Sequence, residues 1–122
     1  MTGWWMSALL SPRGRAPLSH WWASRLLFIP FVLPKSVYED LDVPLGVAVT
    51  LSCCALFFVY VVTVIEIKRW HDFGYSGSWI LINFIPFGFL VTLFLCGGRQ
   101  GDAGPNKYGP PAAKNAKPLC RD

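Results

Sequence analysis

The chain has 122 residues, of which 53% are hydrophobic and 15% are charged, and its net charge is +4. A water-soluble domain carries about 25% charged residues, and a domain of this length could not surround long apolar helices on every side. The composition therefore excludes an ordinary soluble domain and indicates one small domain in a membrane. The cations are not interleaved with aromatic residues, so we expect them to flank membrane spans and not to bind nucleic acid.

The four cysteines lack the spacing of a disulfide framework or a metal site. Cys53 and Cys54 are neighbours in an apolar run, Cys96 ends another run, and Cys120 lies near the end of the chain. We expect them to be small apolar residues and, in the tail, one exposed thiol. The sequence therefore predicts no metal site and no cofactor.

Residues 1–17 are predicted to form an amphipathic, basic N-terminal segment whose tryptophans lie on the headgroup layer. A first span of about residues 18–34 follows, and it contains Arg25 and two prolines. Arg25 would lie about one turn deep, from where its long side chain can reach the headgroups. A short, tilted or kinked span and a helix lying in the membrane plane are both compatible with this segment.

The second span is predicted at about residues 43–66, because residues 43–65 are a run of 23 residues without a charge. About 20 apolar residues in a helix cross a hydrocarbon core of about 30 Å. β-Branched residues weaken a helix in water, but in lipid every backbone group must be bonded internally, which favours a helix here. Glu66 ends the span near the interface, and we expect Arg69, three residues later, to be its partner.

Segment 67–77 is predicted to be the loop between the second and third spans. Lys68 and Arg69 suit both the negative end of a helix and the phosphate layer. Asp72 can pair back to either of them, and Gly74 can take the left-handed conformation that ends a helix. These residues are explained by a tight turn, whereas the one histidine of the segment has no role that a turn requires.

The third span is predicted at about residues 78–96, with Asn83 and Pro86 in its middle. Proline removes one backbone hydrogen bond, so we expect a kink there. A re-entrant hairpin broken at the sequence PFG is the alternative. The tail, residues 97–122, is rich in glycine and proline and is expected to be polar and irregular, because it cannot bury enough surface to fold alone.

The number of spans decides which segments share a side of the membrane. Three spans place the N-terminal segment and segment 67–77 on one side, and the acidic connector 35–42 and the tail on the other. Basic residues are then divided evenly, so the positive-inside rule leaves the orientation open. The re-entrant alternative instead gathers the basic segments on one side and leaves the connector opposite.

Three motifs stand out: KRWHDFGYSGSW, CGGRQGDAGPNKYGPPA and RGRAPLSHWW. The first combines two basic residues, His-Asp, Gly, Ser-Gly and Trp, and the second combines a cysteine, a glycine-spaced linker and Gly-Pro-Asn-basic-aromatic-Gly-Pro. Together they resemble the domain-of-unknown-function family 805, YhaH-like small bacterial inner-membrane proteins. The resemblance covers about residues 11–111, although Leu18 and His20 stand where the family usually has Arg and Glu. It implies a multi-pass protein of the bacterial inner (plasma) membrane, and it implies no reaction.

The candidate functional residues come from these motifs. We expect no catalytic residue and no metal ligand among them. The residues expected to form an interaction site are mostly charged residues, glycines and amides: Gly14, Arg15, Arg69, His71, Asp72, Gly74, Ser76, Gly77, Asn106, Tyr108 and Gly109.

The sequence favours an all-α membrane protein, a small bundle of about three transmembrane helices, with a structural or interaction role and no enzymatic activity. Its expected partners are the lipid bilayer and other membrane proteins or further copies of itself. The alternative is a subunit of an oligomeric channel or transporter, whose pathway would be lined by Arg25, Glu66 and Asn83. A remote alternative, based on residue types alone, is a membrane-surface enzyme that uses His71 and Asp72 as acid and base.

Overall fold

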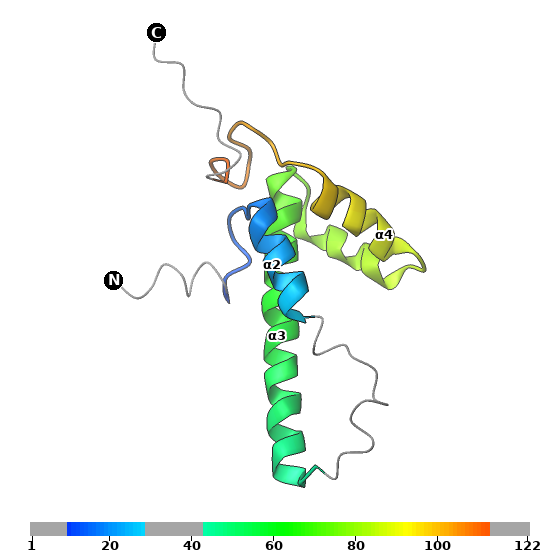
Figure 1. Cartoon of the computed structure of the whole chain (residues 1–122). Coiled ribbons are helices and arrows are strands. Elements are labelled where there is room, and N and C mark those ends of the chain that lie inside the picture. The colour runs from blue at the N-terminus through cyan, green and yellow to red at the C-terminus, as the bar shows by residue number, and fades with distance from the viewer. Residues whose placement is uncertain (1–9, 29–42, 113–122) are drawn as a thin grey trace, which may run out of the picture.

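The computed structural model describes residues 10–28 and 43–112 (Figure 1). Within these ranges the regular elements are all helices, and an isolated bridge joins Asn106 to Gly109. The prediction of an all-helical protein is confirmed for this part of the chain. Predictions for residues 1–9, the connector 35–42, the end of the first span and residues 113–122 lie outside the described residues. In chain order the elements are α2 (Leu18–Phe28), α3 (Leu45–Asp72), the 3₁₀ helix η3 (Gly77–Phe84), α4 (Gly88–Thr92) and the π-helix η4 (Leu93–Gly97).

Helix α3 is the long axis of the molecule, drawn in green in Figure 1. In the part of the chain that the structure describes, it is the helix that is long and apolar enough to cross a membrane, by length and composition. Most apolar side chains of its first half are exposed, whereas its last two turns are largely buried. The helix ends at Asp72 and not near Glu66, so the first half of the expected loop is helical. Arg69 favours this extension, because a cation in the last turn stabilises the negative end of a helix.

The segment expected to be one kinked span is a hairpin of two short helical arms, residues 77–97. Arm η3 ends at Phe84, and arm α4 begins at Gly88 and folds back beside it (Figure 1). Two features cause the reversal: Pro86 has no N–H to continue a helix, and Phe87 adopts a left-handed conformation with φ 63°. The break lies at the predicted site, and the chain reverses there instead of bending, as the alternative of a hairpin broken at PFG expected.

The hydrophobic core lies where α2, the last turns of α3 and the end of the hairpin meet. Trp21 of α2, Ile65 and Trp70 of α3 and Cys96 of η4 form its centre. The indole N–H of Trp22 donates to the carbonyl of Gly97 (2.9 Å), which fastens α2 to the hairpin end. This core holds together the three segments that carry the sequence motifs.

The described part of the tail crosses the end of α3 and does not lead away from it. The N–H of Asp102 donates to the carbonyl of Asp72, the last residue of α3 (2.9 Å). The tail therefore contacts segment 67–77, whereas three full spans would separate the two by the thickness of a membrane. The hairpin explains the difference, because it returns the chain to the end of α3 from which it left.

Candidate functional site

A buried arginine–aspartate cluster, formed by Arg15, Arg69 and Asp72, occupies the end of α3. Nε of Arg15 donates to Oδ1 of Asp72 (2.7 Å), and Nη1 of Arg69 donates to Oδ2 of the same carboxylate. The side chains of Arg69 and Asp72 are fully buried, and that of Arg15 is 1% exposed. Each carboxylate oxygen is thus paired with a different guanidinium group.

Arg69 also connects α3 to both other chain segments. Its Nε donates to the carbonyl of Cys96 (2.9 Å), and its Nη2 donates to the carbonyl of Arg99. Its Nη1 lies 3.4 Å from the carbonyl of Ala16. One side chain therefore binds the hairpin end, the tail and the segment before α2.

Arg15 connects the N-terminal segment to the tail in a similar way. Its Nη1 donates to the carbonyl of Gly104 (2.8 Å), and its Nη2 donates to the carbonyls of Asp102 and Asp72. A guanidinium group has five N–H donors in a fixed plane, which suits several acceptors around one centre. The side chain thus fixes the path of the tail over the end of α3.

The electrostatics of the cluster favour a structural role. Two guanidinium groups and one carboxylate leave one excess positive charge, which the surrounding backbone carbonyls and the negative end of α3 offset. Burying charges is costly unless they are paired and hydrogen-bonded, and here every guanidinium nitrogen has a protein acceptor. The cluster is therefore suited to fastening segments together, since its charged atoms already bind one another and the backbone.

His71 is held by contacts on both sides of the cluster. Its Nδ1 lies 3.2 Å from the carbonyl of Gly14, and its ring stacks on Tyr108 with centroids 3.8 Å apart and planes 6° apart. The amide of Asn106 donates to the backbone carbonyl of His71 (3.0 Å). The histidine that a turn did not require thus joins the N-terminal segment to the tail.

The remaining candidate residues shape the turns around this site. Gly74 ends α3 with φ +76°, as expected, and Gly109 has φ +125° in the tail turn. Gly77 packs against α3 so closely that a Cβ would lie 2.7 Å from the side chain of Ile67. Ser76 accepts from the N–H of Ser78 (3.4 Å) at the start of η3, and this N-cap role places it outside the cluster.

A second polar cluster, absent from the expected site, lies between α2, α3 and the hairpin; Glu66 and Thr92 in it are buried, whereas Asn83 is exposed. Glu66, which is 2% exposed, pairs with Arg25 of α2 and accepts from the amide of Asn83. The hydroxyl of Thr92 donates to the other end of that amide (2.7 Å). The expected pairing of Glu66 with Arg69 is wrong, because α2 brings Arg25 to Glu66 while Asp72 binds Arg69.

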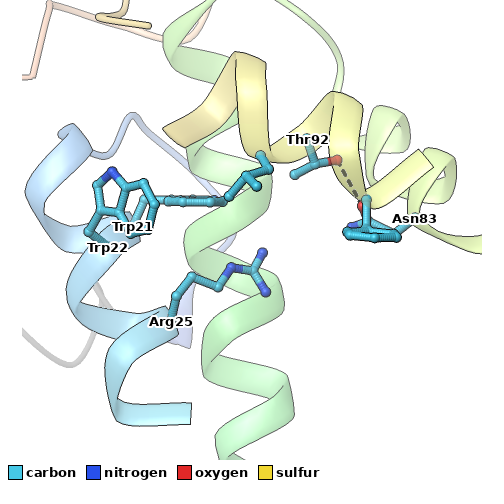
Figure 2. A pocket seen from close by; sticks show the side chains of 7 residues that line it. Trp21, Trp22, Arg25, Asn83 and Thr92 are labelled. Carbon is cyan, nitrogen blue, oxygen red and sulfur yellow. Dashed lines mark hydrogen bonds between the residues drawn. The ribbon is translucent and has the colours of Figure 1, made fainter. Parts of the chain in front are cut away.

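A cavity of about 410 Å³ opens beside this second cluster (Figure 2). Its walls are mainly aromatic and aliphatic, and the Arg25 guanidinium lies 5.0 Å from the centre of the Trp21 ring. The lining residues come from α2 and from both arms of the hairpin: Trp21, Trp22, Arg25, Asn83, Phe89, Thr92 and Leu93. The sequence named Arg25, Glu66 and Asn83 as polar residues of the membrane segments, but gave no signal for Thr92.

The comparisons with known proteins agree with the motifs. Residues 4–110 match the family described as "Protein of unknown function (DUF805)". The chain is 32% identical over 113 residues to "Inner membrane protein YhaI" of Escherichia coli strain K12, which covers 87% of this chain and 92% of the relative, and equally to the protein of that name in strain O157:H7. No solved structure matches the chain. The matched span includes both polar clusters and all the described helices, so the chain belongs to the DUF805 family of proteins of unknown function.

Proposed function

We propose that this chain is a multi-pass integral protein of a bacterial inner membrane with a structural or interaction role and no catalytic activity. Helix α3 supports the membrane location by its length and apolar surface. The name of the Escherichia coli relative supports the inner membrane as the compartment. We assign one crossing to α3. We propose segment 18–34 as the second crossing from its sequence, because its described helix α2 has 11 residues and is by itself shorter than a span.

The observation that carries the proposal is the use of the charged atoms in the arginine–aspartate cluster. Both oxygens of Asp72 accept from arginines, and both guanidinium groups donate to backbone carbonyls of the tail. An acid or base must reach the atom whose proton it transfers, but the Asp72 carboxylate is fully buried and each of its oxygens faces a guanidinium group. The motif residues therefore serve to hold a fixed polar surface at the end of α3, which other membrane proteins or further copies of the chain bind.

Native electrophoresis of gently solubilised membranes tests this role. We expect the wild-type chain to migrate as a complex larger than the monomer. We expect Arg15→Ala to release the monomer, because the tail loses the Arg15 bonds that hold it over the end of α3. Arg13→Ala is the matched control, since Arg13 is exposed and only two residues away. A wild-type chain that migrates as a monomer from native membranes would contradict the interaction role.

A subunit of an oligomeric channel or transporter is the second candidate, and the second polar cluster favours it. Arg25, Glu66 and Asn83 meet beside the cavity within apolar surroundings, and ionisable groups inside a membrane often mark a transport pathway. In this case, proteoliposomes should show an ion or solute flux that Glu66→Gln changes. Wild-type proteoliposomes without such a flux, together with a strictly monomeric chain in nanodiscs, would exclude it.

A further inference from the structure

We propose that the hairpin, residues 77–97, is a re-entrant element whose tip enters one leaflet and whose two ends lie on the same side of the membrane. This inference rests on the proposed membrane location and deepens it by naming the bilayer surface that the hairpin occupies. The partner of the tip is the acyl-chain region of that leaflet.

The arms of the hairpin are too short to cross. Arm η3 has 8 residues, which at about 2.0 Å per residue reach about 16 Å. The returning arm, Gly88–Gly97, reaches about 15 Å at about 1.5 Å per residue. A hydrocarbon core is about 30 Å thick, so each arm spans about half of it.

Both ends of the hairpin are fixed at the same end of α3. Arg69 donates to the carbonyl of Cys96 at the end of the returning arm (2.9 Å). Beyond that arm, the tail is bonded to Asp72 through the N–H of Asp102 and to His71 through the amide of Asn106. These contacts are incompatible with a membrane between the tail and segment 67–77.

The tip has the apolar composition that a lipid environment requires, and part of its backbone is bonded internally. Its side chains are apolar and outward-facing: Phe84 is 85% exposed, Ile85 60% and Phe87 74%. Backbone groups in lipid must be bonded within the protein. Here the N–H of Ile85 donates to Ile82 (3.1 Å), the N–H of Gly88 donates to Ile85 (2.8 Å), and the proline between them has no N–H.

Aromatic side chains at the base of the hairpin place the membrane boundary there. Tyr75 and Trp79 are half-exposed, and they pack against each other and against the buried Trp70 at centroid separations of 5.5–6.1 Å. Tyrosine and tryptophan are enriched at the membrane–water interface because they are apolar with one polar group. The base thus lies at the headgroups and the tip lies deeper.

This arrangement also determines the orientation. The basic residues of the N-terminal segment, the end of α3 and the tail then share one side, opposite the acidic connector 35–42. Basic loops remain in the cytoplasm. The arginine–aspartate cluster is therefore assigned to the cytoplasmic side.

Labelling with a membrane-impermeant maleimide tests the inference in the full-length chain without its native cysteines. Single cysteines replace Tyr75 at the hairpin base, Lys107 in the tail and Leu45 at the start of α3, and all three side chains are exposed. We expect Tyr75→Cys and Lys107→Cys to react at least tenfold more in inside-out vesicles than in right-side-out vesicles. We expect the opposite preference for Leu45→Cys.

The outcomes separate the inference from the proposed function. Labelling of positions 75 and 107 from opposite sides shows that the hairpin crosses and overturns the inference, while positions 75 and 45 on opposite sides still support the crossing by α3. Positions 45 and 75 on the same side, or a chain that alkaline carbonate extracts, would overturn the membrane-crossing proposal itself. Reporter fusions after positions 76 and 112 of the wild-type chain give a second measurement, and reporters active in different compartments would overturn the inference without any cysteine substitution.

Discussion

Asp72 is the anion at the centre of the candidate site, where contacts from three chain segments converge. Its carboxylate accepts from Arg15 and Arg69, and its backbone carbonyl accepts from Arg15 and from the N–H of Asp102. All of these partners lie on segments far apart in the sequence except Arg69. Removing the charge of Asp72 leaves two buried cations without their counter-ion, which is more costly than losing an exposed ion pair.

We therefore predict that Asp72→Asn destabilises the protein by about 3–5 kcal/mol, the range for breaking one partner out of a buried charge pair. A large fall in the midpoint of thermal unfolding in detergent micelles would show it. Asp102→Asn is the matched control, because the exposed Asp102 reaches Arg15 and Asp72 through its backbone and keeps those bonds. Equal midpoints for the two variants would contradict a supporting role of the Asp72 charge.

Gly101 lets the tail backbone approach the Asp72 carboxylate directly. A Cβ at this position would overlap the carboxylate atoms, whereas a Cβ on Gly104 would meet no atom within 4 Å. We predict that Gly101→Ala displaces the tail and costs about 1–3 kcal/mol, as overpacking does, and that Gly104→Ala is neutral. Limited trypsin digestion in micelles measures the displacement through faster cleavage at the exposed Lys107, and equal cleavage of the two variants would show that the tail does not need this close approach.

At the residue scale, short-range pairing could be predicted and long-range pairing could not. The spacing of Arg69 and Asp72 and the left-handed Gly74 follow from helix geometry, and the structure has both. The same spacing rule predicted the wrong partner for Glu66. Arg25 reaches Glu66 only because α2 packs against α3, and this packing cannot be read from the spacing of residues in the sequence. Apart from the Asp72 carboxylate, the acceptors of Arg15 are backbone carbonyls, which exist at every residue and leave no mark in a sequence.

At the scale of elements, the hairpin depends on the close contact of its two arms. A Cβ on Gly88 would overlap the carbonyl of Ile82, so the arms touch at the backbone. The amide of Asn83 on one arm binds the hydroxyl of Thr92 on the other. Pro86 allowed a break to be predicted, but the left-handed Phe87 and the contact at Gly88 decide that the chain reverses, and neither follows from local propensity.

We predict that Thr92→Val loosens the hairpin, because the Asn83 carbonyl loses its donor while the side-chain volume stays similar. An ordinary hydrogen bond contributes about 0.5–1.5 kcal/mol to stability, so the midpoint of thermal unfolding should fall modestly. Thr50→Val is the matched control: Thr50 is exposed on α3, and its hydroxyl binds only the carbonyl of Gly46 in its own helix (2.8 Å). A fall of similar size in the control would assign the effect to the loss of a threonine hydroxyl in general and not to the hairpin.

At the scale of the whole molecule, the chain divides into a polar end and an apolar stem. The polar end holds the arginine–aspartate cluster, the described tail and the base of the hairpin, and the stem is the first half of α3 with its exposed apolar side chains. The sequence predicted this division from the uncharged run 43–65 and the charges after it. It could not place the tail, because that placement depends on whether the chain crosses or returns at Pro86.

The last prediction concerns the solvent of the stem. Leu56 lies near the middle of the apolar run and is 71% exposed, and Leu45 begins α3 and is 80% exposed. In water both leucines would tolerate arginine equally, whereas in a bilayer an arginine at the centre of a span costs about 2.5–3.5 kcal/mol and one at its end reaches the headgroups. We therefore expect Leu56→Arg to reduce the carbonate-resistant, membrane-integrated fraction of the chain strongly, and Leu45→Arg to leave it close to wild type. Equal integration of the two variants would mean that the middle of α3 faces water or protein and not acyl chains, since only a depth-dependent solvent distinguishes two exposed leucines on one helix.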